Sequence, residues 1–471
     1  MSLRTHIGAH LALATAIFCA NASAMDIGVN THRGSTATVN GQVAAIMKER
    51  NLKTSRMDLI GGQDQTALRD QVRQIQANGG SVEVALQISY QWDNSCNPNL
   101  AGVEQDAYNQ TAAAVNSVKD LVHDFEMLNE TQLRPEIMRE VTWNSAGTSV
   151  TPYQGKPCVA TLAAVLRGMS RAIRDIRASS GLPLRAILGE VGRDFGFLTF
   201  MKQNGVLFDV VGFHVYPHAT TASMISDPWF GTGGPLAQLA SFGKPVHVNE
   251  FNCGEIYDST YENSAGSPTT EACLKAFAKH MRDLRSQTIA NIESVHVYEL
   301  LDEPSKAAPE NRFGLMYNLT TPKIHLALAS AFAGGALTAA ERTAITSRGL
   351  LTDAEINAIQ QASAGTVATT PAPAPAPTDT QAPLVGFTGP ADGSVFAPHS
   401  TIWVSAVASD NVGVKQVRFS VSGSACVATS APFNCQLTLP TRKHWSGTIQ
   451  AQATDAAGNT GSASVRVYTS R

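Results

Sequence analysis

The sequence lacks several patterns that define common functional classes. Its 471 residues carry a net charge of −3 and contain no polybasic run, so neither nucleic acid nor an anionic membrane surface is an expected partner. No Cys-x-x-Cys pair is present, which argues against a cysteine zinc site. No Gly-x-Ser-x-Gly motif is present either, which argues against the usual serine esterase.

Long apolar runs are also missing. The run "LALATAIFCA" is too short to span a bilayer, so we expect no membrane insertion. It follows Arg4 and ends in "NASA" before Met25, which is typical of a secretory signal with small residues at its cleavage point. We therefore predict a signal peptide at residues 1–24 and a secreted or periplasmic protein.

Cysteine is scarce but even in number once that segment is removed. Six cysteines would remain, and an even number in an oxidising compartment suggests disulfides. We pair the neighbours in sequence first, which gives Cys253 with Cys273, Cys426 with Cys435, and Cys96 with Cys158. Free buried thiols are the alternative.

A Pro-Ala repeat separates two parts of the chain that differ in their predicted secondary structure. "TTPAPAPAPTDT" predicts a stiff, solvated linker at residues 367–381. Residues 336–366 before it read as short helices. Residues 382–471 after it alternate in short strands separated by turns, which predicts a small β-sandwich. The "DNVGV" and "DAAGN" turns of this stretch resemble those of bacterial immunoglobulin-like modules.

Residues 25–335 alternate strand-like runs with amphipathic helices. In one helical run, residues 274, 277, 278, 281 and 284 are apolar, the spacing of a single buried face. Eight strand–helix units in about 310 residues match a (β/α)8 barrel. An open doubly wound sheet is the alternative, but no Gly-rich phosphate loop follows the first strand. The strand-like runs are 26–30, 53–59, 82–90, 124–130, 185–192, 208–217, 245–250 and 294–301.

Two glutamates end strand-like runs of this barrel. "DFEMLNE" ends in Glu130 on the fourth strand, and "HVNE" ends in Glu250 on the seventh. The carboxyl ends of barrel strands form the active-site face, so these side chains should face each other there. Two carboxylates flanking one sugar can act as a general acid and a nucleophile.

This arrangement resembles clan A glycoside hydrolases, the retaining (β/α)8 glycosidases. The "SRMDL", "GFHVYP" and "YELLDEP" runs are most similar to glycoside hydrolase family 39 and its bacterial exopolysaccharide-degrading relatives. The resemblance implies that Glu130 is the acid/base and Glu250 the nucleophile. It also implies that Asn129 bonds the sugar 2-hydroxyl.

The resemblance extends to the residues around the pair. Arg56 would hold Glu250 ionised, Tyr216 would orient it, and His214 would line the same pocket. The chain departs from the pattern at the eighth strand, where many clan members have a tryptophan and this sequence offers Tyr298. An alternative for Arg56 is a pair with Asp58 or with a barrel carboxylate.

Other polar residues near the strand ends admit more than one interpretation. His32, His214 and His218 suggest a metal site, but "HVYPH" lacks the helical spacing that brings two rings onto one ion. We therefore place His32 and His214 in the substrate pocket and expect neither a metal nor another cofactor. Glu190, at the end of the fifth strand, rivals the catalytic pair, and we interpret it as a substrate-binding or supporting residue.

Tryptophans suggest the kind of substrate. Trp92, Trp143 and Trp229 all follow predicted strands, and flat aromatic faces suit the apolar side of a sugar ring. Core packing is the alternative. Several such platforms favour endo-acting cleavage of a β-linked polysaccharide or oligosaccharide by a monomeric enzyme. A non-catalytic barrel that binds glycans, with the sandwich as an adhesion module, is the second hypothesis.

The strand positions of the pair also predict stereochemistry. Strands four and seven stand on opposite walls of a closed barrel, and we expect both glutamates to end their strands directly. A short carboxyl gap, about 5 Å, leaves no room for a water beside the sugar and implies retention through a covalent intermediate. A gap of about 9 Å would imply inversion.

Overall fold

The computed structural model shows two compact units, one from Met1 to Ala368 and one from Thr369 to Arg471. The structure describes residues 25–32, 36–89, 96–257, 270–365, 381–410, 414–429, 433–455 and 457–470. The predicted signal peptide therefore lies outside the described residues, as does the predicted linker apart from Gln381. Among the described helices, none is long and apolar enough to cross a membrane.

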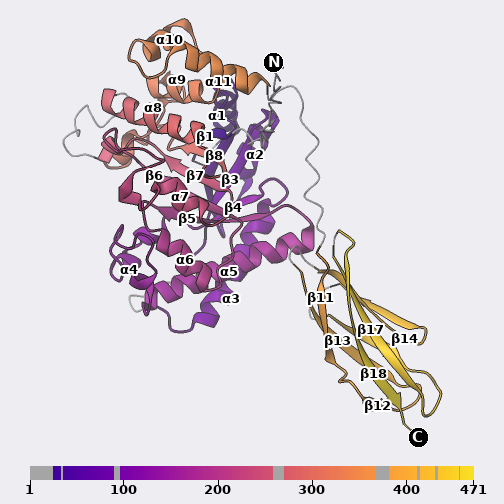
Figure 1. The fold of residues 1–471 in the computed structure, drawn as a ribbon. Coiled ribbons are helices and arrows are strands. Elements are labelled where there is room, and N and C mark those ends of the chain that lie inside the picture. Colours follow the sequence, from indigo (N-terminus) through magenta and orange to yellow (C-terminus); the bar gives the residue numbers. More distant parts are fainter. Residues whose placement is uncertain are drawn as a thin grey trace, which may run out of the picture. The chain divides into compact units, whose positions relative to one another are not determined.

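The first unit is a closed barrel of eight parallel strands, which confirms the predicted fold (Figure 1). The ring closes where the first strand pairs with the last, with Val29 in register with Val297. The strands are β1 (Asp26–Asn30), β2 (Thr54–Ile60), β3 (Ser81–Gln87), β4 (Asp124–Met127), β5 (Arg185–Val191), β6 (Val210–Val215), β7 (Val246–Phe251) and β8 (Ile292–Val297). A two-stranded sheet of β9 (Met316–Asn318) and β10 (Thr321–Pro322) follows them.

Helices follow the strands and surround the ring. They are α1 (Ala37–Glu49), α2 (Thr66–Ala77), α3 (Leu100–Val118), α4 (Pro135–Met138), α5 (Pro157–Ser180), α6 (Phe195–Gln203), α7 (Gly234–Ala240), α8 (Glu271–Ser286) and α9 (Ile324–Phe332). In α8 the five apolar residues predicted to share a face are all buried. The segment after the barrel forms α10 (Ala339–Thr346) and α11 (Asp353–Gly365), whose Ile345 and Ile356 belong to the barrel's own core.

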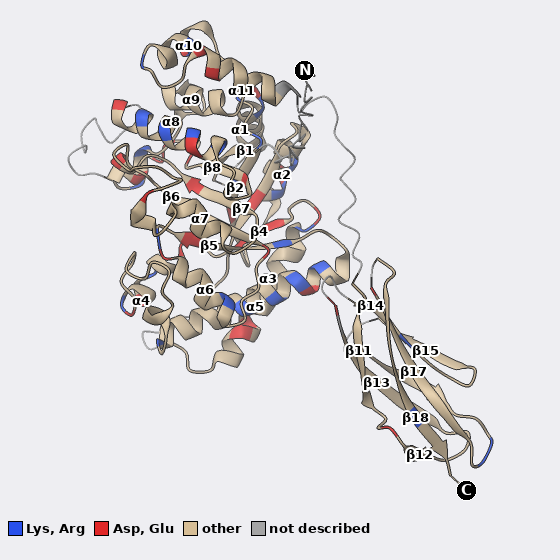
Figure 2. Cartoon of the chain, in the orientation of Figure 1, with Lys and Arg blue, Asp and Glu red and all other residues tan. Residues whose placement is uncertain are grey.

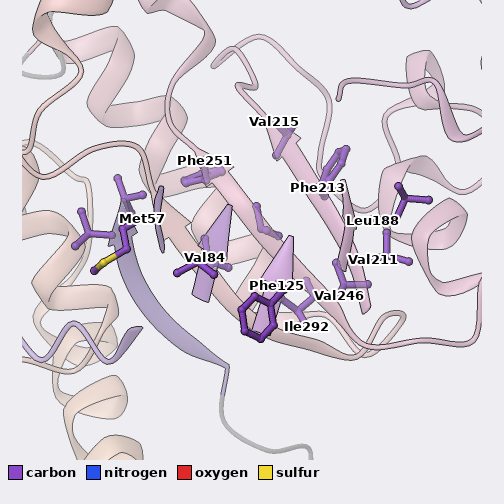
Figure 3. Packing of buried hydrophobic residues seen from close by; sticks show 14 of the residues in the cluster. Met57, Val84, Phe125, Leu188, Val211, Phe213, Val215, Val246, Phe251 and Ile292 are labelled. Atoms are coloured by element: carbon purple, nitrogen blue, oxygen red, sulfur yellow. The ribbon is translucent and has the colours of Figure 1, made fainter. Parts of the chain in front are cut away.

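The core of the barrel unit fills the space between strands and helices. Met57, Val84, Phe125, Phe213 and Phe251 come from five different strands and are at most 2% exposed (Figure 3). Side chains alternate along a strand, so the residues between these positions point into the barrel. The inward set includes the charged residues that form the site.

The fourth strand is shorter than the sequence predicted. It ends at Met127, and the chain then turns through Leu128 (φ 69°) and Glu130 (φ 46°). Glu130 therefore does not end its strand directly, as expected, but stands in a turn three residues beyond it. Glu250, in contrast, lies within β7.

The second unit is a β-sandwich. Three strands pair in the order β11 (Leu384–Gly389), β13 (Thr401–Ser409) and β16 (Phe433–Thr438). Five pair in the order β12 (Ser394–Phe396), β18 (Thr460–Thr469), β17 (Ser446–Asp455), β14 (Val414–Val421) and β15 (Ser424–Ala428). The three predicted disulfides are present, two in the barrel unit and one in the sandwich.

Candidate active site

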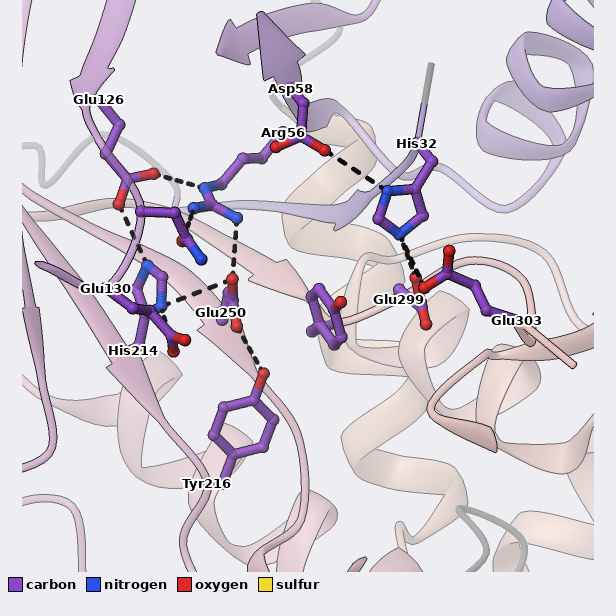
Figure 4. Close-up of polar contacts among 12 residues, drawn as sticks. His32, Arg56, Asp58, Glu126, Glu130, His214, Tyr216, Glu250, Glu299 and Glu303 are labelled. Carbon is purple, nitrogen blue, oxygen red and sulfur yellow. Dashed lines mark hydrogen bonds and ion pairs between the residues drawn. The ribbon is translucent and has the colours of Figure 1, made fainter. Parts of the chain in front are cut away.

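Four strands bring charged side chains together inside the barrel. Arg56 comes from β2, Glu126 from β4, His214 from β6 and Glu250 from β7, and all four are at most 5% exposed (Figure 4). Charges removed from water are costly unless they are paired and hydrogen-bonded. Their contacts therefore decide what the site can do.

Arg56 donates hydrogen bonds to three other residues of the site. Its Nε donates to Glu126 Oε2 at 2.6 Å, its Nη1 to Glu250 Oε1 at 3.0 Å, and its Nη2 to Asn129 Oδ1 at 2.6 Å. The predicted contact with Glu250 is present, and the barrel carboxylate Glu126 is a second partner. Arg56 lies in the middle of β2. One guanidinium thus holds both carboxylates and the amide that follows β4.

Glu250 sits where three donors converge. Besides Arg56, the Tyr216 hydroxyl donates to its Oε2 at 2.6 Å, and His214 Nδ1 lies 3.5 Å from its Oε1. Burial raises the pKa of Glu250 above its ordinary value, and the charge of Glu130 adds to this, while His214, Arg56 and Tyr216 lower it. The donors fix the orientation of the carboxylate, and the charges of His214 and Arg56 offset part of the effect of its burial on the pKa.

His214 bridges the carboxylates. Its Nδ1 is 3.1 Å from Glu130 Oε1, and its Nε2 is 3.2 Å from Glu126 Oε1. Burial alone would lower the pKa of His214, but Glu250, Glu126 and Glu130 outweigh it and raise the pKa to about 10. The ring is therefore an imidazolium at neutral pH, with both nitrogens donating.

Glu130 and Glu250 face each other at short range. A carboxyl oxygen of each, together with a ring nitrogen of His214, lies within 4.8 Å of the others. This is the short gap that the sequence predicted. Glu130 reaches this position from the turn after β4, with 27% of its side chain exposed, so it is the more accessible of the two.

Each glutamate of this pair lines a cavity. A small one of about 200 Å³ is lined by Asn129 and Glu250 and by the predicted residues His32 and Tyr298. A larger cleft of about 780 Å³ is lined by Glu130 and by other residues that include His214, Tyr216, Tyr257, Trp143 and Trp229. The two tryptophans are 44% and 47% exposed, so they are not core residues. Trp92 lies outside the described residues.

His32 belongs to a second charged group. Its ring contacts Glu299 at 2.5 Å, Glu303 at 3.4 Å and Asp58 at 3.6 Å (Figure 4). Hydrogen bonds to Asp58 and Glu299 raise the pKa of His32 to about 10. Asp58 therefore pairs with His32 and not with Arg56.

Among the described residues, three groups have ligand-type atoms close enough to hold a metal ion. One contains Cys253 and Cys273, whose sulfurs are already joined in a disulfide. The other two are centred on His32 and His214, whose ring nitrogens already contact carboxylates on both sides. The residues present thus fit ion pairs better than metal ligation.

Glu190 is not part of the site. A side chain added at Gly189 would meet Glu126 inside the barrel, so the next residue along β5 points outward. Burial, with the nearby charge of Asp194, raises the pKa of Glu190 well above its ordinary value. Strand alternation thus turns Glu190 away from the two cavities, which leaves the supporting role as the interpretation that fits its position.

Glu126 is the residue that sequence reasoning missed. It sits in the centre of the "DFEMLNE" run, is fully buried, and links Arg56 to His214. Burial would raise the pKa of Glu126, but the two cations lower it to about 2. A glutamate amid buried strand residues needs such partners, and that was the available signal.

The C-terminal unit matches a known family model. Residues 383–467 match a bacterial Ig domain. No curated protein matches the chain.

Solved structures similar to the chain include three β-glycan hydrolases. An endo-beta-1,4-mannanase from Thermotoga petrophila is 12% identical, with 94% of this chain and 98% of that one covered and a TM-score of 0.39. A rice beta-glucosidase is 12% identical (66% and 98% covered, TM-score 0.42), and an endo-laminarinase from Formosa is 15% identical (62% and 83% covered, TM-score 0.38). At these values the likenesses add nothing to the fold already described.

Proposed function

We propose that the protein is a secreted, retaining glycoside hydrolase that cleaves within a β-linked polysaccharide, such as a bacterial exopolysaccharide or a plant cell-wall glycan. The observation that carries the proposal is the pair of carboxyl oxygens, from Glu130 and Glu250, within 4.8 Å of each other. Retaining enzymes hold their two carboxyl groups about 5 Å apart, whereas inverting enzymes leave room for a water between them.

In the first step, a Glu250 oxygen attacks the anomeric carbon as the bond to the leaving oxygen breaks. Glu130 gives its proton to the leaving glycosidic oxygen, so the leaving chain departs as a neutral alcohol. In the second step, Glu130 takes a proton from water, the water oxygen bonds the anomeric carbon, and Glu250 leaves as a carboxylate. Arg56 and His214 supply the positive charge that stabilises Glu250 as a nucleophile and as a leaving group.

The two cavities divide the sugar chain between them. Asn129 and Glu250 line the small cavity, so the sugar that becomes bonded to the enzyme belongs there. Glu130 lines the large cleft, which therefore receives the leaving part of the chain, with Trp143 and Trp229 as apolar platforms. A cleft of this size beyond the acid supports cleavage inside a polymer. Family 39 and its exopolysaccharide-degrading relatives are our candidates for a finer placement.

The test begins with a hydrolysis screen over bacterial and plant β-glycans, with the products sized. On a substrate that the protein cleaves, Glu130→Gln and Glu250→Gln should each lower kcat at least about a thousandfold. Glu49→Gln is the matched control, because that side chain is 72% exposed on α1. Normal rates in either site variant would contradict the proposal.

The roles of the two glutamates can be separated by azide rescue. With Glu250→Ala, azide should attack from the emptied side and give a glycosyl azide of inverted configuration. With Glu130→Ala, azide should instead open the covalent intermediate and give the retained configuration. Proton NMR of the first-formed anomer checks the parent enzyme, and an inverted product would refute retention. If the parent protein bound glycans but cleaved none of those in the screen, the non-catalytic alternative would be favoured.

A further inference from the structure

A tryptophan stands exposed on the outer face of the three-stranded sandwich sheet, which comprises β11, β13 and β16. Along β13, Ile402, Val404 and Ala406 point into the sandwich core, whereas Trp403 and Val407 are each 63% exposed. Alternation puts Trp403 on the outer face of β13, paired with β16 on one side and two residues beyond the last β11 pair, Gly389 with Ser405, on the other. Tryptophan is enriched at binding surfaces, because its ring is apolar and its N–H can still reach a polar partner.

The side chains beside this indole are polar but uncharged. Register places Gln436 of β16 directly beside Trp403, and Asn434 beside Ser405. Both carboxamides are exposed. The sequences of β11, β13 and β16 contain no Lys, Arg, Asp or Glu, and the strands labelled β11 and β13 are accordingly tan in Figure 2. The face thus offers one flat apolar ring edged by neutral donors and acceptors.

On the opposite flank of β13, the two β11 positions closest to the indole on this face are glycines. Gly386 pairs with Val407 and Gly389 pairs with Ser405, and a side chain added at either glycine would point into open space. A ligand can therefore lie flat beside the indole without meeting a ridge from β11. On the other flank, Cys435 lies between the two carboxamides and is bonded to Cys426 of the second sheet, which ties β16 in place.

We propose that this face binds a neutral polysaccharide, with one sugar ring stacked on Trp403 and sugar hydroxyls bonded by Gln436 and Asn434. The proposal goes beyond the hydrolytic site, since it assigns a second glycan site to the other unit, although the choice of a glycan rests on the proposed function of the barrel. Nucleic acid and anionic lipid need positive charge, which the strands lack. Val407 and Leu384, 63% and 74% exposed, lie on the same face toward the other end of these strands, so a protein partner is the alternative that the test has to separate from a glycan.

The test uses the full chain carrying Glu250→Gln, so that the polymer is not consumed. Migration is compared in native gels that contain barley β-glucan, glucomannan, xylan or no polymer. Trp403→Ala should weaken binding to a retarding polymer by about tenfold, since a stacked aromatic ring contributes roughly that much. Tyr468→Ala is the matched control, because Tyr468 is 37% exposed on β18 of the other sheet, and it should bind like the parent.

Three results would overturn the proposal: no retardation in any polymer gel, equal retardation of parent and Trp403→Ala, or a dimer of the parent that dissociates in Trp403→Ala. Thermal melting checks that Trp403→Ala and Tyr468→Ala are folded. Gln436→Ala is a second, milder substitution on the same face as Trp403. The same substitutions in a chain with native Glu250 should leave the hydrolysis of short soluble oligosaccharides unchanged. A further outcome is that the parent chain hydrolyses none of the polymers while Trp403→Ala still weakens binding in the gels. In that case the proposed activity fails and this inference stands.

Discussion

The buried carboxylate Glu126 offers a direct measure of how strongly the site is held together. It is 0% exposed and accepts from Arg56 at 2.6 Å while His214 lies 3.2 Å away. Its pKa falls from 4.5 to about 2, which corresponds to about 3 kcal/mol of stability at neutral pH. Removing one partner from a buried ion pair costs a similar amount. Glu126→Gln keeps the shape and removes only this charge.

We therefore expect Glu126→Gln to lower the free energy of unfolding of the barrel by about 3 kcal/mol at pH 7, and its Tm by about 5 °C. A lowered pKa stabilises the folded state above the ordinary pKa, and that contribution is lost as the pH falls through the folded value. The difference between parent and variant should thus shrink as the pH drops from about 4.5 toward 2. Denaturant unfolding followed by circular dichroism at several pH values measures it.

Asp120→Asn is the control for this experiment. The pKa of Asp120 is also lowered, chiefly by its hydrogen bond to Arg69, but its side chain is 56% exposed. A solvated pair contributes less than about 1 kcal/mol, so this variant should melt close to the parent. If Glu126→Gln were as stable as Asp120→Asn at pH 7, or if its deficit did not shrink in acid, the electrostatic reasoning would be wrong.

Three further predictions follow from single contacts. Tyr216→Phe removes the donor to Glu250, and because a hydrogen bond to a charged group contributes about 1.5–3 kcal/mol, kcat should fall roughly 10- to 100-fold with little change in KM in steady-state kinetics. The pKa of His214 is raised to about 10, so the charged ring stabilises the folded state fully below about pH 6.5 and loses this effect as the pH rises through 10. His214→Gln should therefore have a lower free energy of unfolding than the parent below about pH 6.5, and the difference should shrink toward pH 10. A difference that stays constant with pH in denaturant titrations would contradict this. Cys96→Ser with Cys158→Ser opens a loop of 62 residues and should cost about 4 kcal/mol in equilibrium unfolding, whereas an unchanged Tm would show that the bridge does not restrict the unfolded chain.

The barrel could be predicted from the sequence because strand-like and helix-like runs alternate eight times. The contacts of Glu250 with Arg56 and Tyr216 were expected from the resemblance alone, and the structure shows both. The catalytic roles of these residues stay predictions.

The errors have definite physical causes. The end of β4 could not be predicted, because leucine and glutamate rarely adopt positive φ and nothing in "LNE" signals it. Glu190 was misplaced because only its position at a strand end was considered, whereas the parity of β5 turns it outward. Glu126 was passed over for the opposite reason, since it lies in the middle of its strand. Following the alternation of inward and outward side chains along β4 and β5 would have corrected both assignments.

The charged cluster has a consequence for how the chain folds. Arg56, Glu126, His214 and Glu250 come from strands spread over almost the whole ring, and β1 meets β8 only after about 270 residues of chain. A partly built sheet would bury some of these charges without their partners, at a cost of several kcal/mol each. Incomplete rings are thereby penalised, so we expect these residues to make barrel closure more cooperative, and any activity to appear during refolding only when the ring closes.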